Sequence, residues 1–117
     1  MISEQLSFLP DSLPDSHPFP PARERTVWNA LPQRVKDRFL KAGEAALAAA
    51  IAPLPLSLWL DFSHTGRRTA WEDAYFSRRA RLCALVCAEC VEHTGRFLGA
   101  IADTVWALCE ESAWQLP

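Results

Sequence analysis

The stretch TAWEDAYFSRRARLCALVCAECVEHTG, residues 69–95, decides the fold class. It opens with Thr69 and Glu72, whose spacing is that of a capping box, in which each side chain satisfies a free backbone N–H at a helix N-terminus. Gly95 follows as a residue type common where helices stop. The stretch therefore predicts one long helix from Thr69 to a stop at Gly95. Its second half, residues 82–88, is apolar on nearly all sides, which is typical of a helix buried by several neighbours.

A helix is also expected before this stretch, from about Ala30 to Ala50. Asn29 is the predicted N-cap, Pro32 fits the first turn, and Pro53 ends the helix. Its predicted buried face consists of Trp28, Leu31, Val35, Phe39, Ala42, Ala46 and Ala50, which recur at helical spacing.

Two shorter helices complete the prediction. Residues 54–62 alternate as in a strand, but a lone strand would have no partner, so we expect a helix from Ser57 to Thr65 that stops at Gly66. A last helix is expected to begin near Arg96 or Phe97 and to run close to the end of the sequence. The sequence thus predicts an all-α protein.

The first residues have a different composition. Residues 1–22 contain five prolines and a tandem Leu-Pro-Asp-Ser repeat, with no helical or strand period. We therefore expect an extended Pro-rich arm over residues 1–27 and a helical segment over residues 28–117.

Composition and charge argue against several classes of function. A formal net charge of -2 gives no field that would recruit nucleic acid. No apolar run approaches the roughly 18 residues of a membrane span. An acidic residue, Glu4, lies where a secretory signal would carry a basic one, so we expect a cytoplasmic protein. Five Trp and six Phe in 117 residues exceed what so short a chain can bury, which indicates that something outside the chain covers the excess.

Three cysteines and a histidine are candidate metal ligands. Cys83, Cys87 and Cys90 share one helical face, with His93 one turn further, but three side chains along two helical turns do not converge easily on a tetrahedral ion. We therefore expect these cysteines, and Cys109, to pack in the core, and we predict no metal site.

Acid–base roles for His64, His93 and Tyr75 also have simpler alternatives. The two histidines lie near predicted helix C-termini, where a cation stabilises the helix dipole, and capping or exposure is the favoured interpretation. His17 has no plausible partners within the arm. Tyr75 lies beside other aromatic residues and is expected at the edge of the core.

Two sets of residues could face a ligand. Arg78, Arg79 and Arg81 could hold a carboxylate or sulfate through the fork of the guanidinium group, although a solvated helix face is the favoured interpretation. The second set is Glu110, Glu111 and Trp114, because aromatic rings stack on sugars and carboxylates accept hydrogen bonds from hydroxyls; surface charge is the alternative. The sequence contains no phosphate-binding loop, nucleophile elbow or zinc-protease motif, so we predict no cofactor.

The stretch WALCEESAWQLP, residues 106–117, resembles the N-terminal helical region of heparinase II/III-like proteins, which carry a Trp-x-x-Cys-x-Glu...Trp-x-x-Pro pattern. Residues 54–68 and 78–90 agree with the same region, so that the likeness covers most of residues 28–117. The sequence departs from the family pattern at Arg67, where an Asn is expected. The Ala-His-Asn that usually follows the pattern is absent.

This resemblance implies the opening antiparallel helical hairpins of an incomplete α/α toroid. The parent proteins add a β-sandwich domain and cleave uronate-containing polysaccharides by β-elimination, in which a base removes the proton α to the carboxylate and an acid assists the departing oxygen. The catalytic base and acid would lie beyond Pro117, so we assign no catalytic residue and expect the chain alone to be inactive. Glu111 and Trp114 match positions near the sugar cleft and are expected to contact the acidic polysaccharide.

Uncovered apolar helix faces would also make such a chain self-associate. The alternative hypothesis is a free-standing helical module for protein interaction, without catalysis, whose apolar faces close on themselves.

Overall fold

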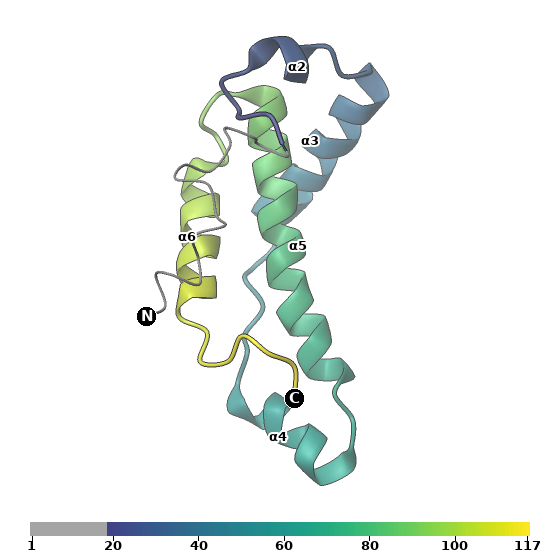
Figure 1. The fold of residues 1–117 in the computed structure, drawn as a ribbon, viewed down its shortest axis with the longest axis vertical. Helices are drawn as coiled ribbons and strands as arrows, with labels where there is room; N and C mark the ends of the chain where they lie inside the picture. Colours follow the sequence, from purple (N-terminus) through teal and green to yellow (C-terminus); the bar gives the residue numbers. More distant parts are fainter. Residues whose placement is uncertain (1–18) are drawn as a thin grey trace, which may run out of the picture.

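The computed structural model describes residues 19–117, which form five α-helices and no strand (Figure 1). The helices are α2 (Arg25–Asn29), α3 (Gln33–Ala48), α4 (Leu56–Thr65), α5 (Thr69–Glu92) and α6 (Leu98–Cys109). The predicted all-α class is therefore confirmed for this part of the chain. Residues 1–18, with the Leu-Pro-Asp-Ser repeat and His17, lie outside the described residues.

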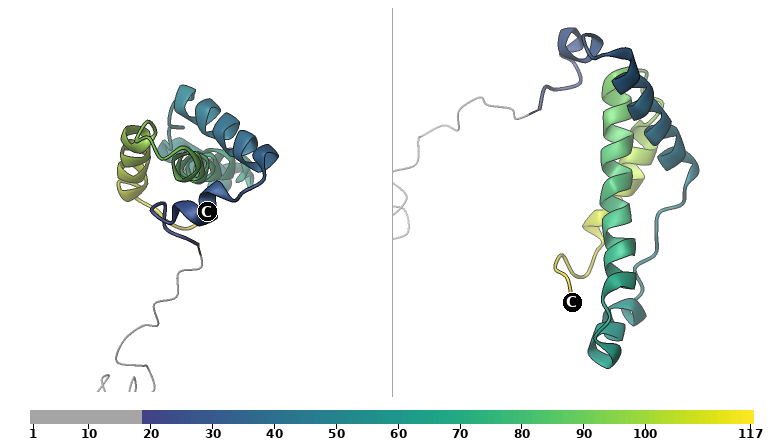
Figure 2. Two further views of the ribbon diagram at one scale, coloured as in Figure 1. Left: turned by 90° about the horizontal axis from the view of Figure 1, so that it is seen from above. Right: turned by 90° about the vertical axis from the view of Figure 1, so that its right-hand side faces the viewer.

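Helix α5 is the central element. Helices α3 and α6 flank it and both run antiparallel to it, while α4 lies at its N-terminal end (Figure 1). Figure 2 shows that α3 and α6 lie to two sides of α5, so that within residues 19–117 no helix covers one long side of α5. The structure is thus a helical layer with little interior.

The core forms where α3 approaches α5 most closely. Leu85, Ala88 and Phe97 are buried together, and Leu40, Ala46, Ala100 and Ile101 pack around them. Gly43 is the buried residue of α3, and a Cβ atom there would overlap the Ala88 side chain and lie 3.3 Å from the Phe97 ring. Because neither Gly43 nor Ala88 carries a large side chain, the two helices meet almost backbone to backbone.

The start of α3 differs from the prediction. The chain forms a separate short helix, α2, and α3 begins only at Gln33 with Pro32 in the N-cap position. The cause is Pro32, since the residue before a proline is disfavoured in the α conformation. Asn29 therefore lies in the last turn of α2 and caps nothing, and residues 25–27 of the expected arm are helical.

The buried face of α3 is also rotated from the predicted one. Ala42 is exposed, and Ala50 is exposed and lies beyond the helix, whereas Leu40 and Gly43 face the core. The predicted face does not include Gly43, because glycine has no apolar side chain and does not contribute to a pattern of hydrophobic residues.

Helix α5 begins at Thr69 as predicted, but no capping box forms. Arg68 is the N-cap residue and already has helical dihedral angles, φ -108° and ψ -10°, so Thr69 lies one position too far along to cap. Glu72 instead pairs with Arg68, with 3.0 Å between the carboxylate oxygen and Nε. Helix α4, by contrast, ends as predicted at Gly66, which has a φ of 73°.

The turn from α5 to α6 depends on a buried carboxylate. Glu89 is only 8% exposed, and its two oxygens accept hydrogen bonds from the backbone N–H groups of Gly95, at 2.7 Å, and Phe97, at 3.1 Å. His93 takes the left-handed conformation, φ 56°, and ends α5 two residues before Gly95, where the stop was predicted. Glu89 thereby stabilises the loop conformation in which Phe97 packs into the core.

Arginine side chains satisfy the carbonyl groups at helix C-termini. Nη1 of Arg81 donates to the carbonyls of Ala46 and of Ala49, the latter at 2.6 Å, and Nε donates to Thr104 at 3.1 Å. Arg25 donates in the same way to the carbonyl of Cys90, at 2.6 Å, near the end of α5. One side chain, Arg81, thus connects α3, α5 and α6, and it belongs neither to a solvated face nor to a ligand site.

The expectation that residues 82–88 are buried by several neighbours holds for only one face of the helix. Leu85 and Ala88 are buried, but Cys83 and Val86 are exposed because no helix within residues 19–117 covers that side of α5. Cys109 is exposed as well, so core packing describes neither it nor Cys83. Among the described residues, no helix combines the length and the apolar character needed to cross a membrane.

Replacing Gly43 by Ala should destabilise the protein by about 1–3 kcal/mol, because the new methyl group overlaps Ala88 and separates two helices. Gly99→Ala is the matched control: Gly99 is also helical, has no atom within 4 Å of an added Cβ, and should gain up to about 1 kcal/mol from helix propensity. Urea denaturation followed by circular dichroism measures both changes. Equal stability of the two variants would contradict the close helix approach.

Glu89→Gln should destabilise the protein by about 1–3 kcal/mol, because the amide places an N–H where a carboxylate oxygen now accepts a backbone N–H. Glu92→Gln, on the same helix but with a more exposed side chain, serves as the control and should cost less. The same denaturation experiment compares them, and hydrogen exchange at Gly95 and Phe97 should quicken only in the Glu89 variant. Unchanged exchange at these two amides would argue against the proposed role of Glu89.

Candidate functional site

A groove of about 590 Å³ lies between α4, α5 and the end of α6. Its lining is mainly apolar, with two tryptophans and a small group of charged residues. The lining residues are Leu54, Leu56, Trp59, Trp71, Arg78, Ala107, Glu110, Glu111, Ser112 and Ala113. This volume is within the range of small-molecule sites, which are mostly apolar with a few polar groups.

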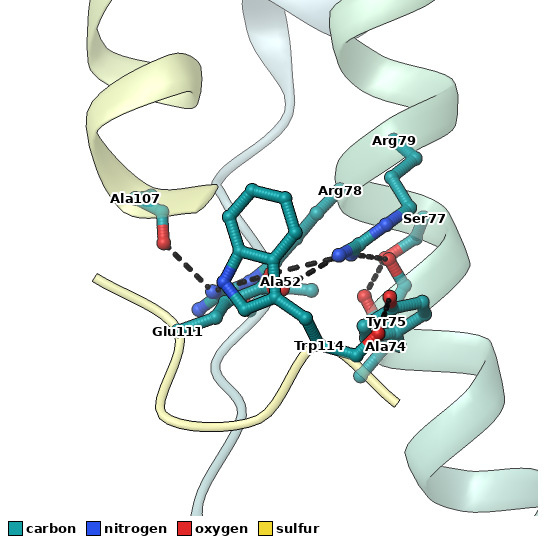
Figure 3. A network of polar contacts seen from close by, with 9 residues as sticks. All are labelled: Ala52, Ala74, Tyr75, Ser77, Arg78, Arg79, Ala107, Glu111 and Trp114. Atoms are coloured by element: carbon teal, nitrogen blue, oxygen red, sulfur yellow. Dashed lines mark hydrogen bonds and ion pairs between the residues drawn. The ribbon is translucent and has the colours of Figure 1, made fainter. Parts of the chain in front are cut away.

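A cluster of two arginines and one glutamate closes one wall of the groove (Figure 3). Glu111 accepts from Nη1 of Arg78 at 3.2 Å and from Nη2 of Arg79 at 2.7 Å. The Glu111 side chain is only 2% exposed, and those of Arg78 and Arg79 are 13% and 27% exposed. Two guanidinium groups share this carboxylate, and the carboxylate of Glu110, which also lines the groove, offsets their remaining positive charge.

The same arginines fix the chain around the groove. Nε of Arg78 donates to the carbonyl of Ala52 at 2.6 Å and Nη1 to that of Ala107 at 3.3 Å, which joins the linker before α4 to the end of α6. Arg79 lies over the ring of Tyr75, with 3.3 Å between the guanidinium carbon and the ring centroid. Arg78 and Arg79, like Arg81, point inward and are not part of a solvated face.

The residues after α6 are held at two points. Glu111 is bound by the arginines, and the hydroxyl of Tyr75 donates to the carbonyl of Trp114 at 3.0 Å (Figure 3). We call residues 110–117 the tail. Tyr75 is buried, as its predicted place at the core edge implied, and its hydroxyl positions the tail.

Glu111 and Trp114, the two residues assigned to sugar contact, have different surroundings. Both Glu111 oxygens already accept hydrogen bonds from arginine side chains, so this carboxylate holds Arg78 and Arg79 in place. The Trp114 side chain is 66% exposed and offers a free aromatic face, while Glu110 is exposed at the rim. A ligand can therefore stack on Trp114 directly but reaches Glu111 only by displacing an arginine.

The other candidates for chemistry lie away from the groove. His64 and His93 are exposed near the ends of α4 and α5, as expected. Burial raises the pKa of the Cys87 thiol, with further increases from Cys90 and Cys83, and burial likewise raises that of Cys90. These thiols stay protonated at neutral pH and are poor nucleophiles. Within residues 19–117, no three His, Cys, Asp or Glu side chains are grouped so that they could hold a metal ion.

The tryptophan pair in the groove could not be predicted from the sequence pattern. The rings of Trp59 and Trp71 meet edge to face, with 5.1 Å between centroids. Trp71 is 6% exposed, and its buried Nε1 donates to no acceptor in the described part of the chain. Such an orphan donor is rare in proteins and requires an explanation.

No protein-family model and no curated protein matches this chain.

Glu111→Gln should destabilise the protein by about 1–3 kcal/mol and release the tail, because the amide is uncharged and its NH₂ group would take the place of an oxygen that now accepts from Nη2 of Arg79. Glu110→Gln is the neighbouring control and should have little effect, since that side chain is exposed. Denaturation gives the stability change, and limited proteolysis shows whether the tail is cleaved sooner. A tail that resists protease equally in both variants would contradict the role assigned to Glu111.

Proposed function

We propose that this chain is the opening helical part of a heparinase II/III-like polysaccharide lyase, and that it supplies structure and sugar contacts but no catalytic residue. In this proposal the antiparallel helices α3, α5 and α6 begin an α/α toroid, and further hairpins pack on them. The resemblance of residues 54–68, 78–90 and 106–117 suggests the family, and all three segments border the groove.

The observation that carries the proposal is the outer face of α6. This helix has one charged residue, Asp103, yet Leu98 is 57% exposed, Val105 42% and Trp106 69%. A helix that is apolar on all sides is normally buried. An uncovered α6 is therefore what a helical layer would present if another hairpin packs on it.

The groove suits the proposed sugar contacts in part. Trp114 offers an exposed ring for stacking on a sugar, and Nη2 of Arg78, which takes part in none of the hydrogen bonds that Arg78 makes to Ala52, Ala107 and Glu111, would donate to a uronate carboxylate. Under this proposal Glu111 acts by positioning the arginines and not by contacting the sugar itself.

An activity assay tests the catalytic part of the proposal. The purified chain is incubated with heparin and with polygalacturonate, and the unsaturated uronate product is followed by ultraviolet absorbance. We expect no product, because the base and acid are assigned to residues beyond this chain. Reading the coding sequence downstream of Pro117 tests the rest: an in-frame Ala-His-Asn followed by helical and β segments supports the lyase, and a stop codon supports the interaction module.

The uncovered face of α6 predicts self-association of the chain. Trp106→Gln should weaken this association about tenfold, close to 1.4 kcal/mol, because an exposed indole is a common anchor of interfaces. Leu47→Gln, an exposed apolar position on α3, is the control and should leave the association unchanged. Sedimentation equilibrium over a range of concentrations measures both.

The same measurement separates the two hypotheses. An ill-defined series of aggregates fits an uncovered toroid face, whereas a single dimer of fixed affinity fits a free-standing interaction module. If the wild-type chain stays monomeric at all concentrations, the predicted self-association through α6 is wrong.

A further inference from the structure

We infer that the open side of α5 binds a second copy of this chain, with the two α5 helices packed antiparallel. This side of the helix is mainly apolar, and no helix within residues 19–117 covers it (Figure 2). The dimer does not depend on the polysaccharide proposal, because it uses a different face of the molecule from α6. Three features of the open side carry the inference: the spacing of its apolar residues, their sizes and the charges at its two ends.

The apolar residues of the open side recur along α5 at alternating steps of four and three. They are Phe76, Ala80, Cys83, Cys87 and Cys90, with Val86 at their edge. We call these six residues the α5 seam. Phe76 is 50% exposed and Val86 38%, and Cys83 is exposed as well. Alternating steps of four and three are typical of the line along which two helices pack, so the seam fits a helical partner.

The seam has a large side chain at one end and small ones at the other. Phe76 lies toward the N-terminal end of α5, and Cys87 and Cys90 lie toward its C-terminal end. In an antiparallel pair, the Phe76 ring of each copy meets the small cysteine side chains of the other copy. A parallel pair would bring the two Phe76 rings together and leave a gap between the cysteines, which is poor packing. The seam therefore complements itself under the two-fold symmetry of a dimer.

One end of the seam is negatively charged. Asp73 is exposed one turn before Phe76. The other charged side chains beside this end are already in ion pairs, Glu72 with Arg68 and Arg79 with Glu111. Asp73 is thus the charge at this end that a partner could neutralise.

The opposite end of the seam is positively charged. The guanidinium group of Arg25 donates to the carbonyl oxygen of Cys90 at 2.6 Å, and within residues 19–117 all its acceptors are neutral. Burial raises the pKa of the Cys90 thiol, and the nearby charge of Arg25 opposes this rise. The neighbouring charges of Arg23 and Glu24 offset each other. An antiparallel copy brings Asp73 of each chain to Arg25 of the other, whereas a parallel copy would bring like charges together.

A single pair of helices makes a small interface. The seam extends about 21 Å along α5, because a helix rises about 1.5 Å per residue. Two such helices bury less than the roughly 800 Å² per partner of a standard stable interface. We therefore expect a weak dimer, with a dissociation constant on the order of 10–100 µM.

Ala80→Glu tests the seam, because it would bury a charge without a partner at the centre of the helix pair. Ala80 is exposed in the single chain, so the variant should fold normally. Ala42→Glu makes the same change at an exposed position of α3 and is the control. Both are measured by sedimentation equilibrium in the Trp106→Gln chain, where association through α6 is weakened. The Ala80 variant should dimerise at least about tenfold more weakly than the control. Equal dissociation constants would overturn the proposal.

Asp73→Lys tests the antiparallel direction, because it places a positive charge opposite Arg25 of the other copy. The dimer should weaken about tenfold at low salt, and added salt should reduce the difference. Asp37→Lys makes the same change of charge on α3 and should leave the dimer unchanged. If the two variants dimerise equally at low salt, the antiparallel pairing is wrong.

Labelling with iodoacetamide identifies what covers the seam. Cys83 and Cys109 are both exposed in the single chain, and mass spectrometry of the digested protein gives the labelling rate of each. In the Trp106→Gln chain, Cys83 should be labelled about fivefold more slowly at about 1 mM than at about 10 µM, whereas the rate of Cys109 should stay nearly constant. A Cys83 rate that is low at both concentrations indicates cover by another part of the same chain, and a rate that is high at both indicates no cover. Either result excludes the dimer.

Discussion

The contact between Gly43 of α3 and Ala88 of α5 is the constraint on which the rest of the structure depends. The absence of a side chain at Gly43 lets the two helices meet nearly backbone to backbone, and Phe97 then closes the contact from the start of α6. A larger residue at either position would move α3 outward. The carbonyls at the end of α3 would then move away from Arg81, and the connection of α3 to α6 through that side chain would be lost.

With so small a core, much of the cohesion between elements comes from buried or half-buried charged side chains. Arg25 and Arg81 occupy carbonyl groups near the ends of helices, Glu89 accepts two backbone N–H groups in the turn before α6, and Arg78 and Arg79 hold Glu111. Such contacts are directional, unlike apolar packing, and they place a chain segment at one position. They explain how a thin helical layer keeps its linker and its tail in place although none of residues 19–117 covers one side of α5 or the outer face of α6.

The groove and the outer face of α6 offer different kinds of recognition. The groove is concave and mainly apolar, with Arg78, Glu110 and Glu111 among its lining residues, a composition typical of small-molecule sites. The face of α6 is apolar along its length and carries one charge, so its chemistry is that of a helix packing surface. Described residues of this chain line the groove, whereas none of residues 19–117 covers the outer face of α6.

The sequence by itself determined the all-α class, the start of α5 at Thr69 and the stop of α4 at Gly66, because helical spacing and glycine act through the local backbone. It also indicated Glu111 and Trp114 as candidate ligand contacts. It could not show that Glu111 is enclosed by Arg78 and Arg79, since those residues are more than thirty positions apart along the chain. Nor could it show that Gly43 marks the closest helix contact, because glycine carries no apolar signal. Whether an arginine meets water, a carbonyl or a carboxylate, and whether a tryptophan such as Trp71 finds an acceptor, depends on which distant elements fold beside it, and only the tertiary structure decided these contacts.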